Sequence, residues 1–218
     1  MKRKRHIFDI RLLPMDIARC CYFLMRAVFW VRKRTPEGER WRGKLRGGAI
    51  LAANHSSFRD PILLGVSFFY RRVFFLIGEV VMANPVRNFL LKGVGGIKID
   101  RNIADLEAIK KSVSVLKRGK LLAMFPQGGI QKGEQVESVK AGAVLMALQA
   151  GVPIIPIHLQ PGKHWYQPTT MIIGQPVDPA KLIQKKMPST ADLTRVSQVL
   201  LEEMNRCAAA TERERESV

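Results

Sequence analysis

From about residue 45 onward, short apolar runs of strand length alternate with segments whose apolar residues recur at helical spacing. Apolar runs of about four to eight residues, bounded by glycine, proline or polar residues, are typical of buried strands. Their alternation with helices favours an α/β fold, because each helix then covers a face of the sheet. We expect one α/β domain with a mixed sheet flanked by helices. The expected strands are residues 47–55, 73–80, 120–126, 152–159 and 169–174, and the expected helices are 60–70, 103–118 (closed by Gly119), 140–151 and 189–207.

A basic segment with an amphipathic helix is expected before this domain. Between residues 15 and 31, apolar side chains recur at the spacing of one helix face, at Ile17, Cys20, Cys21, Leu24, Val28 and Val31. Aromatic residues lie within this segment and clusters of lysine and arginine flank it, which suits the interface of a bilayer with anionic lipids. The alternative is a helix that packs on the domain and has a solvated charged edge.

The chain is accordingly divided at residue 45. Residues 1–44 hold the membrane-associating helix and a linker rich in glycine and proline that begins near residue 34. Residues 45–218 form the domain, with a C-terminal helix and a charged tail, TERERESV, that is expected to be solvated.

The charge of the chain predicts an anionic partner. Lysine and arginine outnumber aspartate and glutamate by 36 to 18, so the formal net charge is +18 and the isoelectric point is near 10.4. Nucleic acid, acidic lipids and phosphorylated carriers all meet this requirement. Nucleic acid is not expected, because neither an aromatic RNA-binding signature nor a recognisable helix-turn-helix is found.

The cysteines predict neither disulfides nor a metal site. Cys20, Cys21 and Cys207 form no CxxC pair, and no histidine stands at a metal-ligand spacing from them. A reducing, intracellular setting is therefore expected. The basic N-terminus lacks an apolar run with a small-residue cleavage site, so no secretory signal is expected. No run of about 18 apolar residues suits a membrane span.

His55 and Asp60 are the candidate catalytic residues. They lie in the segment NHSSFRD, between an expected strand and an expected helix, where α/β folds build their sites. A neutral imidazole is a suitable base near pH 7, and a carboxylate on its other nitrogen fixes the tautomer. Five positions of regular helix would turn the two side chains about 140° apart, so they meet only if the segment is irregular. Alternatively, Asp60 caps the helix that Pro61 begins.

Two glycine-containing segments are candidates for contact with a ligand. In GVGGIKIDR, Gly95 and Gly96 let the backbone approach a ligand closely, and Arg101 offers a planar fork for a phosphate. In AMFPQGG, Pro126 and Gly128 form a tight turn that presents backbone N–H groups to an anion. Plain turns and an exposed arginine explain both segments equally well without further context.

Together, four segments resemble the sequence blocks of the glycerolipid acyltransferase family, which includes the lysophosphatidate acyltransferases. The resemblance covers roughly residues 45–180 in the family's order. It implies acyl transfer from a thioester to a hydroxyl, with His55 as general base, Asp60 as its orienting partner and Arg101 on the acceptor's phosphate. The segments are NHSSFRD with Asn54, GVGGIKIDR, AMFPQGG, and KAGAVLMALQAGVPIIPI with Pro153 and Pro156.

The third segment departs from the family's FPEGTRS, because Gln127 and Ile130 stand where the family has glutamate and arginine. The resemblance places this block, with Gln127 and Gly128, in the acceptor site. Loss of a charge-assisted hydrogen bond costs about 1.5–3 kcal/mol, and Lys132 offers a charge without the bidentate fork. The acceptor is therefore either lysophosphatidate-like or another alcohol, such as a lyso-ornithine-type lipid, a glycolipid or a polyketide-like alcohol.

The expected donor is a thioester of acyl carrier protein or coenzyme A, and the positive charge suits either carrier. No metal or cofactor is expected, and no covalent acyl-enzyme. The remaining expected partners are the lipid acceptor and an anionic membrane surface, with the protein peripheral or monotopic on the cytoplasmic face. A catalytically silent lipid-binding relative stays open as an alternative, because of Gln127 and Ile130.

Overall fold

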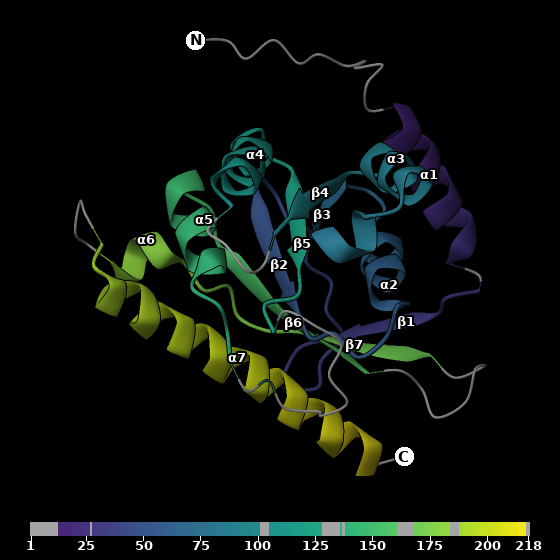
Figure 1. Ribbon diagram of the computed structural model, residues 1–218. Helices are drawn as coiled ribbons and strands as arrows, with labels where there is room; N and C mark the ends of the chain where they lie inside the picture. The colour runs from purple at the N-terminus through teal and green to yellow at the C-terminus, as the bar shows by residue number, and fades with distance from the viewer. Residues whose placement is uncertain are drawn as a thin grey trace.

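The computed structural model describes residues 13–26, 28–100, 105–127, 136, 138–160, 168–183 and 188–216 (Figure 1). In these ranges the elements are α1 (Leu13–Met25), β1 (Val31–Arg34), β2 (Ala49–Ala53), α2 (Asp60–Ser67), β3 (Val73–Gly78), the 3-10 helix η2 (Glu79–Met82), α3 (Pro85–Gly93), β4 (Gly96–Ile99), α4 (Leu106–Lys117), β5 (Leu121–Met124), α5 (Gly142–Ala150), β6 (Ile154–Gln160), β7 (Thr169–Ile173), α6 (Pro179–Leu182) and α7 (Thr190–Glu216).

The strands form one seven-stranded sheet in the order β1-β7-β6-β2-β5-β3-β4. Strands β6, β2, β5, β3 and β4 are parallel to one another, whereas β7 is antiparallel to β6 and parallel to β1. The mixed sheet expected from the sequence is thus confirmed. Every residue of β2 and β5 is buried, because helices cover both faces of the sheet's centre. This explains why both strands are continuous apolar runs.

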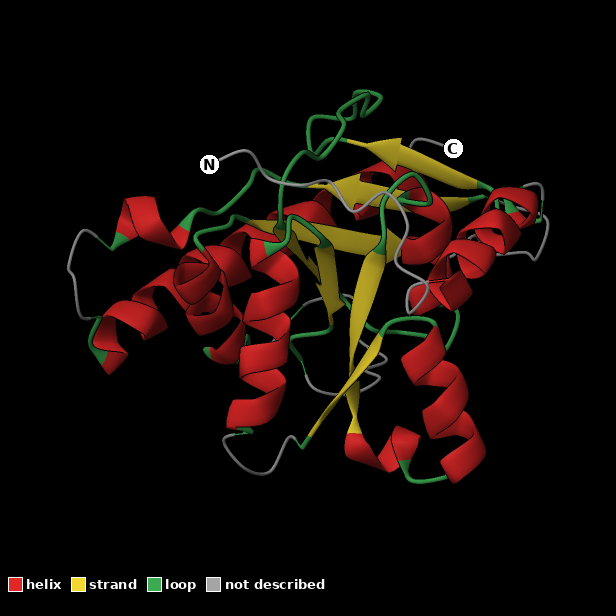
Figure 2. Ribbon diagram, turned by 90° about the horizontal axis from the view of Figure 1, so that it is seen from above, coloured by secondary structure: helices red, strands yellow, loops and turns green. Residues whose placement is uncertain are grey.

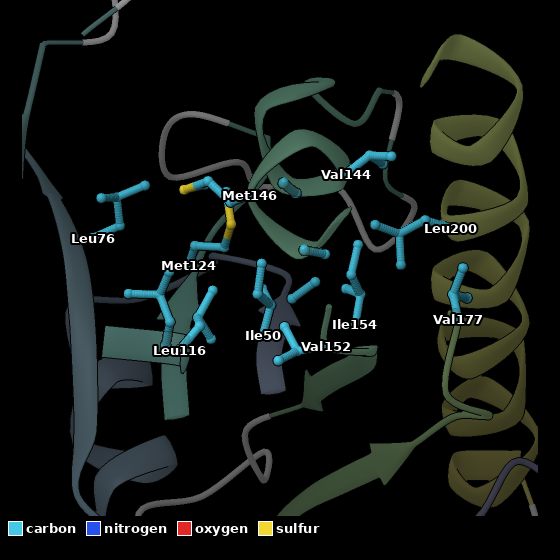
Figure 3. Close-up of a cluster of buried hydrophobic side chains, with 14 of the residues drawn as sticks. Ile50, Leu76, Leu116, Met124, Val144, Met146, Val152, Ile154, Val177 and Leu200 are labelled. Carbon is cyan, nitrogen blue, oxygen red and sulfur yellow. The ribbon is translucent and has the colours of Figure 1, made fainter. Parts of the chain in front are cut away.

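Alternate residues of the central strands serve two separate cores. Ile50 of β2 and Met124 of β5 pack toward α4, α5 and α7, as the close-up of this cluster shows (Figure 3). Leu51 and Ala123 face the other way and pack with Leu64 of α2. The two-residue period of a strand therefore divides one apolar run between two helix layers, with α1, α2 and α3 away from α4 and α5 (Figures 1 and 2).

Helix α1 is docked on the domain through its polar and aromatic side. Asp16 forms an ion pair with Arg72 (Nη2 to Oδ2, 2.6 Å), and the pKa of Asp16 is lowered, chiefly by this hydrogen bond. Met15 packs over Gly95, which has a φ of +93°, and Tyr22 packs over Gly65 of α2. The contact with α2 fixes α1 on the face of the sheet that α2 covers.

The outer side of α1 carries the apolar stripe expected from the sequence. Ile17 and Leu24 are 57% and 71% exposed, and Cys20, Cys21 and Phe23 are exposed with them. The helix packs on the domain, which is one of the two interpretations that the sequence left open, and Ile17 and Leu24 face outward. Among the described residues, no helix has the length and apolar character needed to cross a bilayer.

The expected helix over residues 15–31 is too long at its C-terminal end. It ends at Met25, and Val31–Arg34 form strand β1 at the edge of the sheet, ahead of residue 45 where the domain was expected to begin. The sequence VRKR conceals this strand because three of its four residues are basic. Lys33 packs between the rings of Trp41 and Phe68, and burial lowers its pKa to about 8.

Other differences concern short or charged elements. Helix α3 and strand β4 were not expected, because residues 81–99 were interpreted only through the glycines of GVGGIKIDR; the expected strand 73–80 ends at Gly78, where η2 follows. The C-terminal tail is also different from expectation, since α7 continues to Glu216 rather than ending near Cys207. Alanine, glutamate and arginine are strong helix formers, so a charged tail of this composition extends the helix.

The end of the expected linker is packed against the domain. Arg71 donates hydrogen bonds to the carbonyl oxygens of Gly47 (2.5 Å) and Gly119 (2.6 Å), which joins the start of β2 to the end of α4. Gly47 has a φ of +73° and open space around it. A Cβ on Gly48 would instead overlap the backbone carbonyl oxygen of Leu116. Close approach of two backbones therefore requires glycine at residue 48.

We predict that replacement by alanine lowers the free energy of unfolding by different amounts at Gly48 and Gly47. We expect Gly48→Ala to lower the free energy of unfolding by about 3 kcal/mol, since backbone atoms must move to remove the overlap. Gly47→Ala is the matched control and should cost about 1–2 kcal/mol, the cost of a left-handed conformation alone. Urea unfolding of both variants measures the difference. An equal or smaller loss for Gly48→Ala would contradict the close packing.

Candidate active site

The candidate site lies at the carboxyl edge of the two central strands. Strands β2 and β5 are parallel neighbours in which Ala52 is level with Met124. The segments that follow Ala53 and Met124 therefore leave the sheet side by side. Loops at the carboxyl ends of parallel strands are where open α/β sheets bind ligands.

His55 and Asp60 meet at this edge. The Nδ1–H of His55 donates to Oδ2 of Asp60 at 3.0 Å, and the backbone N–H groups of Ser56 and Ser57 donate to the same oxygen at 2.8 Å each. Residues 54–59 form neither helix nor strand, which is the irregularity that the spacing of the two side chains required. Asp60 is fully buried, whereas the His55 side chain is 13% exposed.

The alternative that Asp60 caps helix α2 is wrong. The helix begins at Asp60 itself, Arg59 occupies the N-cap position, and no side chain caps the helix. The carboxylate of Asp60 turns back onto the loop that carries His55, where it accepts hydrogen bonds from three groups. Its fixed position is therefore explained by the loop and the imidazole rather than by the helix end.

This geometry defines the chemical state of the imidazole. A carboxylate only accepts hydrogen bonds, so the proton of neutral His55 is placed on Nδ1 and the lone pair on Nε2. Within the described residues, the bond to Asp60 is the ring's one hydrogen bond. Nε2 can thus accept a proton from a bound molecule, while the buried carboxylate stabilises the resulting imidazolium.

Asn54 fixes the end of β2, directly before the histidine. Its side-chain N–H donates to the carbonyl oxygen of Leu159 (3.0 Å), and its side-chain oxygen accepts from the N–H of Leu159 (2.7 Å). The buried amide therefore extends the pairing of β2 with β6 by one residue. This places the backbone of His55 relative to two strands, which is a structural role for Asn54.

Two residues that follow β5 complete the surroundings of His55. The ring of Phe125 stacks on the imidazole, with 4.1 Å between centroids and 17° between planes. The side-chain Oε1 of Gln127 accepts a hydrogen bond from the backbone N–H of His55 at 3.3 Å. Gln127 was expected in the acceptor site, and the structure shows that its oxygen also holds the main chain of the candidate base.

Phe125 is the residue that sequence reasoning missed. It follows strand β5 and precedes Pro126, which is buried beside it. The available signal was an aromatic side chain at the end of the expected strand 120–126, which the structure places beside β2. The register could not be known from the sequence, and the stacking depends on it.

The other candidate residues are distributed over the fold. Gly95 precedes β4, Gly96 is its first residue and Pro153 precedes β6, so all three lie at the edge of the sheet opposite His55. The space beside the two glycines is filled by Met15, Leu91 and Ile77. Pro156 lies within β6, level with Ala52. Arg101, Gly128 and Lys132, together with Ile130, are outside the described residues.

In the part of the chain that the structure describes, no set of side chains is arranged to hold a metal ion. No group of three or more histidine, cysteine, aspartate or glutamate side chains is clustered there. The candidate site is built instead from one imidazole, one carboxylate and the hydrogen bonds that fix them.

The sequence model of the acyltransferase family matches residues 31–160, a range that includes His55, Asp60 and Gln127. The chain belongs to the acyltransferase family. A 1-acyl-sn-glycerol-3-phosphate acyltransferase of Bacillus subtilis is 28% identical over 158 residues, which cover 70% of this chain and 77% of that protein. This agrees with the resemblance to lysophosphatidate acyltransferases, which is confirmed.

Two further relatives bear on specificity and fold. A lyso-ornithine lipid O-acyltransferase of Pseudomonas aeruginosa is 32% identical over 109 residues, which cover 50% of this chain and 41% of that protein. The crystal structure of the 1-acyl-sn-glycerophosphate acyltransferase PlsC from Thermotoga maritima matches 89% of this chain and 78% of its own, with a TM-score of 0.56 and 23% identity. The second similarity shows that the two proteins share a fold.

The contact of Gln127 with His55 predicts a specific kinetic effect. Gln127→Leu removes the acceptor of the His55 N–H, and we expect kcat to fall by about tenfold, because one hydrogen bond contributes about 0.5–1.5 kcal/mol. Gln127→Glu keeps an acceptor oxygen and should stay within about threefold of the wild type. Steady-state kinetics with varied acceptor separate the roles. A rise in KM for the acceptor at unchanged kcat would assign Gln127 to acceptor binding alone.

Proposed function

We propose that this protein transfers an acyl group from an acyl thioester to a hydroxyl of a lipid acceptor, with His55 as general base. The observation that carries the proposal is the His55–Asp60 pair, in which a buried carboxylate holds Nδ1 and leaves Nε2 for substrate. Membership of the acyltransferase family supports the reaction class. Asp60 orients the imidazole and stabilises its protonated form.

The proposed reaction needs one proton carrier. Nε2 of His55 takes the proton of the acceptor hydroxyl as its oxygen attacks the thioester carbonyl carbon. The new carbon–oxygen bond forms and the carbon–sulfur bond breaks, which releases an ester and a thiolate. The imidazolium then returns its proton to the thiolate sulfur. Stacking on Phe125 and the backbone contact with Gln127 keep the imidazole in place through both proton transfers.

We propose acyl carrier protein or coenzyme A as the carrier of the acyl group. Both are anionic, and the chain has a formal net charge of +18. The proposed chemistry requires no metal or cofactor, since a thioester is already activated and the base is a side chain. Arg101 and Lys132 remain the candidates for the acceptor's anionic group, with Gly128 offering a backbone N–H.

The acceptor we propose is lysophosphatidate-like, in line with the name of the relative from Bacillus subtilis. A second candidate is a lyso-ornithine-type lipid or another alcohol. It is favoured by the loss of two charged groups at Gln127 and Ile130 and by the similarity to the lyso-ornithine lipid O-acyltransferase. A catalytically silent lipid-binding relative is the third, but the complete His55–Asp60 pair argues against it.

The protein is further proposed to work on the surface of a membrane, at its cytoplasmic face. Helix α1 turns Ile17 and Leu24 away from the domain, and such an exposed stripe marks an interaction surface. The exposed Arg26 follows the stripe, and basic residues beside an apolar helix face favour anionic lipids. A peripheral or monotopic association fits this arrangement.

Removal of the proposed base is the direct test of the reaction. We expect His55→Ala to lower turnover by about 100-fold or more, the usual scale for a general base. Ser56→Ala is the control, because it keeps the backbone N–H group that donates a hydrogen bond to Asp60. This variant should retain most of the activity. Transfer of labelled acyl groups to lysolipids measures both variants. Unchanged turnover in a folded His55→Ala protein would refute the proposed mechanism.

The membrane proposal is tested on α1 without deleting any part of the sheet. Ile17→Glu combined with Leu24→Glu should lower binding to anionic vesicles by about tenfold or more, because two apolar side chains lose their burial. Leu182→Glu on α6 is the matched control, since Leu182 is 38% exposed on another element. Vesicle sedimentation gives the bound fraction. Equal binding by both proteins would exclude α1 as an anchor.

A further inference from the structure

We propose that η2 and α3 form a second membrane-contacting surface, distinct from α1, which holds the active-site edge of the sheet against an anionic bilayer. This inference rests on the proposed function, because it concerns how the same site reaches a lipid acceptor. The surface, called the α3 surface below, consists of Val80, Val81, Val86, Phe89 and Leu90.

The exposure of the α3 surface is unusual for a helix in a domain with a well-formed core. None of the nine residues of α3 is buried. Val80 is 84% exposed, Phe89 79% and Val86 65%. Val86, Phe89 and Leu90 stand at positions i, i+3 and i+4, so they share one side of the helix. An apolar helix face normally packs on a core, and an exposed group of large apolar side chains indicates a partner.

The surface is preorganised by polar contacts. The side-chain oxygen of Asn84 accepts hydrogen bonds from the N–H groups of Val86 and Arg87, and Pro85 occupies the first helical turn. Met82 of η2 is 2% exposed and anchors the segment in the domain. The apolar side chains are thus held outward by a capped helix with a buried attachment point.

The position of the surface links it to the candidate site. Strands β2 and β3 are both parallel to β5, so β3 ends at Gly78 on the sheet edge where β2 leads into His55. Because η2 follows Gly78 directly, Val80 and Val81 lie at that edge. Phe58, in the loop between His55 and Asp60, is 83% exposed. A bilayer that contacts Val80 and Val81 would therefore lie at the edge of the sheet that carries His55.

The α3 surface is close to α1. Pro14 approaches Gly93 at the end of α3, and Met15 packs on Gly95, two residues farther along the chain. The two helices lie side by side in Figure 1. The outward stripe of α1 and the α3 surface can therefore contact one extended bilayer, whereas either surface alone is small.

The charges around the surface favour lipid over another protein chain as the occupant. Arg87 and Lys92 are exposed on α3 itself. The nearby acid Glu79 is paired with Lys98 at 2.5 Å. Cationic side chains around apolar ones complement anionic headgroups above an apolar layer. A second copy of this basic chain would bring like charges together.

The test is vesicle binding by Val80→Glu combined with Phe89→Glu. Both side chains are largely exposed, so folding should be unaffected, and circular dichroism and thermal unfolding verify this. We expect affinity for vesicles of phosphatidylglycerol and phosphatidylcholine to fall by about tenfold or more. Leu182→Glu is a control on another element and should bind as the wild type; it adds one negative charge, whereas the double variant adds two. Arg87→Gln combined with Lys92→Gln should weaken binding to these vesicles more than binding to pure phosphatidylcholine vesicles.

Activity on a short-chain, water-soluble acceptor separates this inference from the proposed function. The Val80→Glu/Phe89→Glu protein should keep wild-type turnover on that acceptor and lose turnover on vesicle-embedded acceptor. Wild-type vesicle affinity in this variant overturns the α3 surface and leaves the His55 mechanism standing. Sedimentation equilibrium tests whether the surface binds a second copy of the chain instead. If the wild type is a dimer, and the variant is a monomer with unchanged vesicle affinity, the surface belongs to a dimer interface. Activity without His55 would overturn the proposed function alone.

Discussion

The buried carboxylate of Asp60 is the constraint on which the candidate site depends. One of its oxygens accepts hydrogen bonds from the imidazole of His55 and from the N–H groups of Ser56 and Ser57. A buried charge is costly unless such donors surround it, so the loop must keep the irregular path that supplies them. Helix α2 begins at the same residue. The carboxylate thus fixes the tautomer of the candidate base and the shape of the loop that carries it.

The rest of the sheet positions this loop from both sides. Asn54 joins the end of β2 to Leu159 of β6, and Gln127, which follows β5, accepts the N–H of His55. The imidazole therefore lies at the end of β2, between β6 and β5, and Phe125 stacks on its ring and limits its rotation. Because every residue of β2 and β5 is buried, these strands are rigid and hold the imidazole in one position. The N-terminal segment belongs to the same frame, because β1 is hydrogen-bonded to β7.

The sequence predicted the features that short-range chemistry determines. Apolar runs located the strands β2, β5 and β6, and the spacing of His55 and Asp60 required the irregular loop that is found. What it missed depends on distant partners. Strand β1 accommodates Lys33 because the rings of Trp41 and Phe68 lie against its ammonium group, and the stacking of Phe125 on His55 follows from the β2–β5 register. Helix periodicity gave the apolar stripe of α1 but not the side on which it packs.

The side of α1 that packs on the domain indicates which surface the protein presents to its surroundings. Helix α1 docks through Asp16, Met15 and Tyr22 and leaves its apolar stripe outside. Apolar area in water costs about 25 cal/mol per Å², and α3 repeats the same arrangement. In the proposed membrane association, a bilayer covers the exposed apolar side chains of these two neighbouring helices. Their outward faces would then act as a guide that brings a lipid hydroxyl to Nε2.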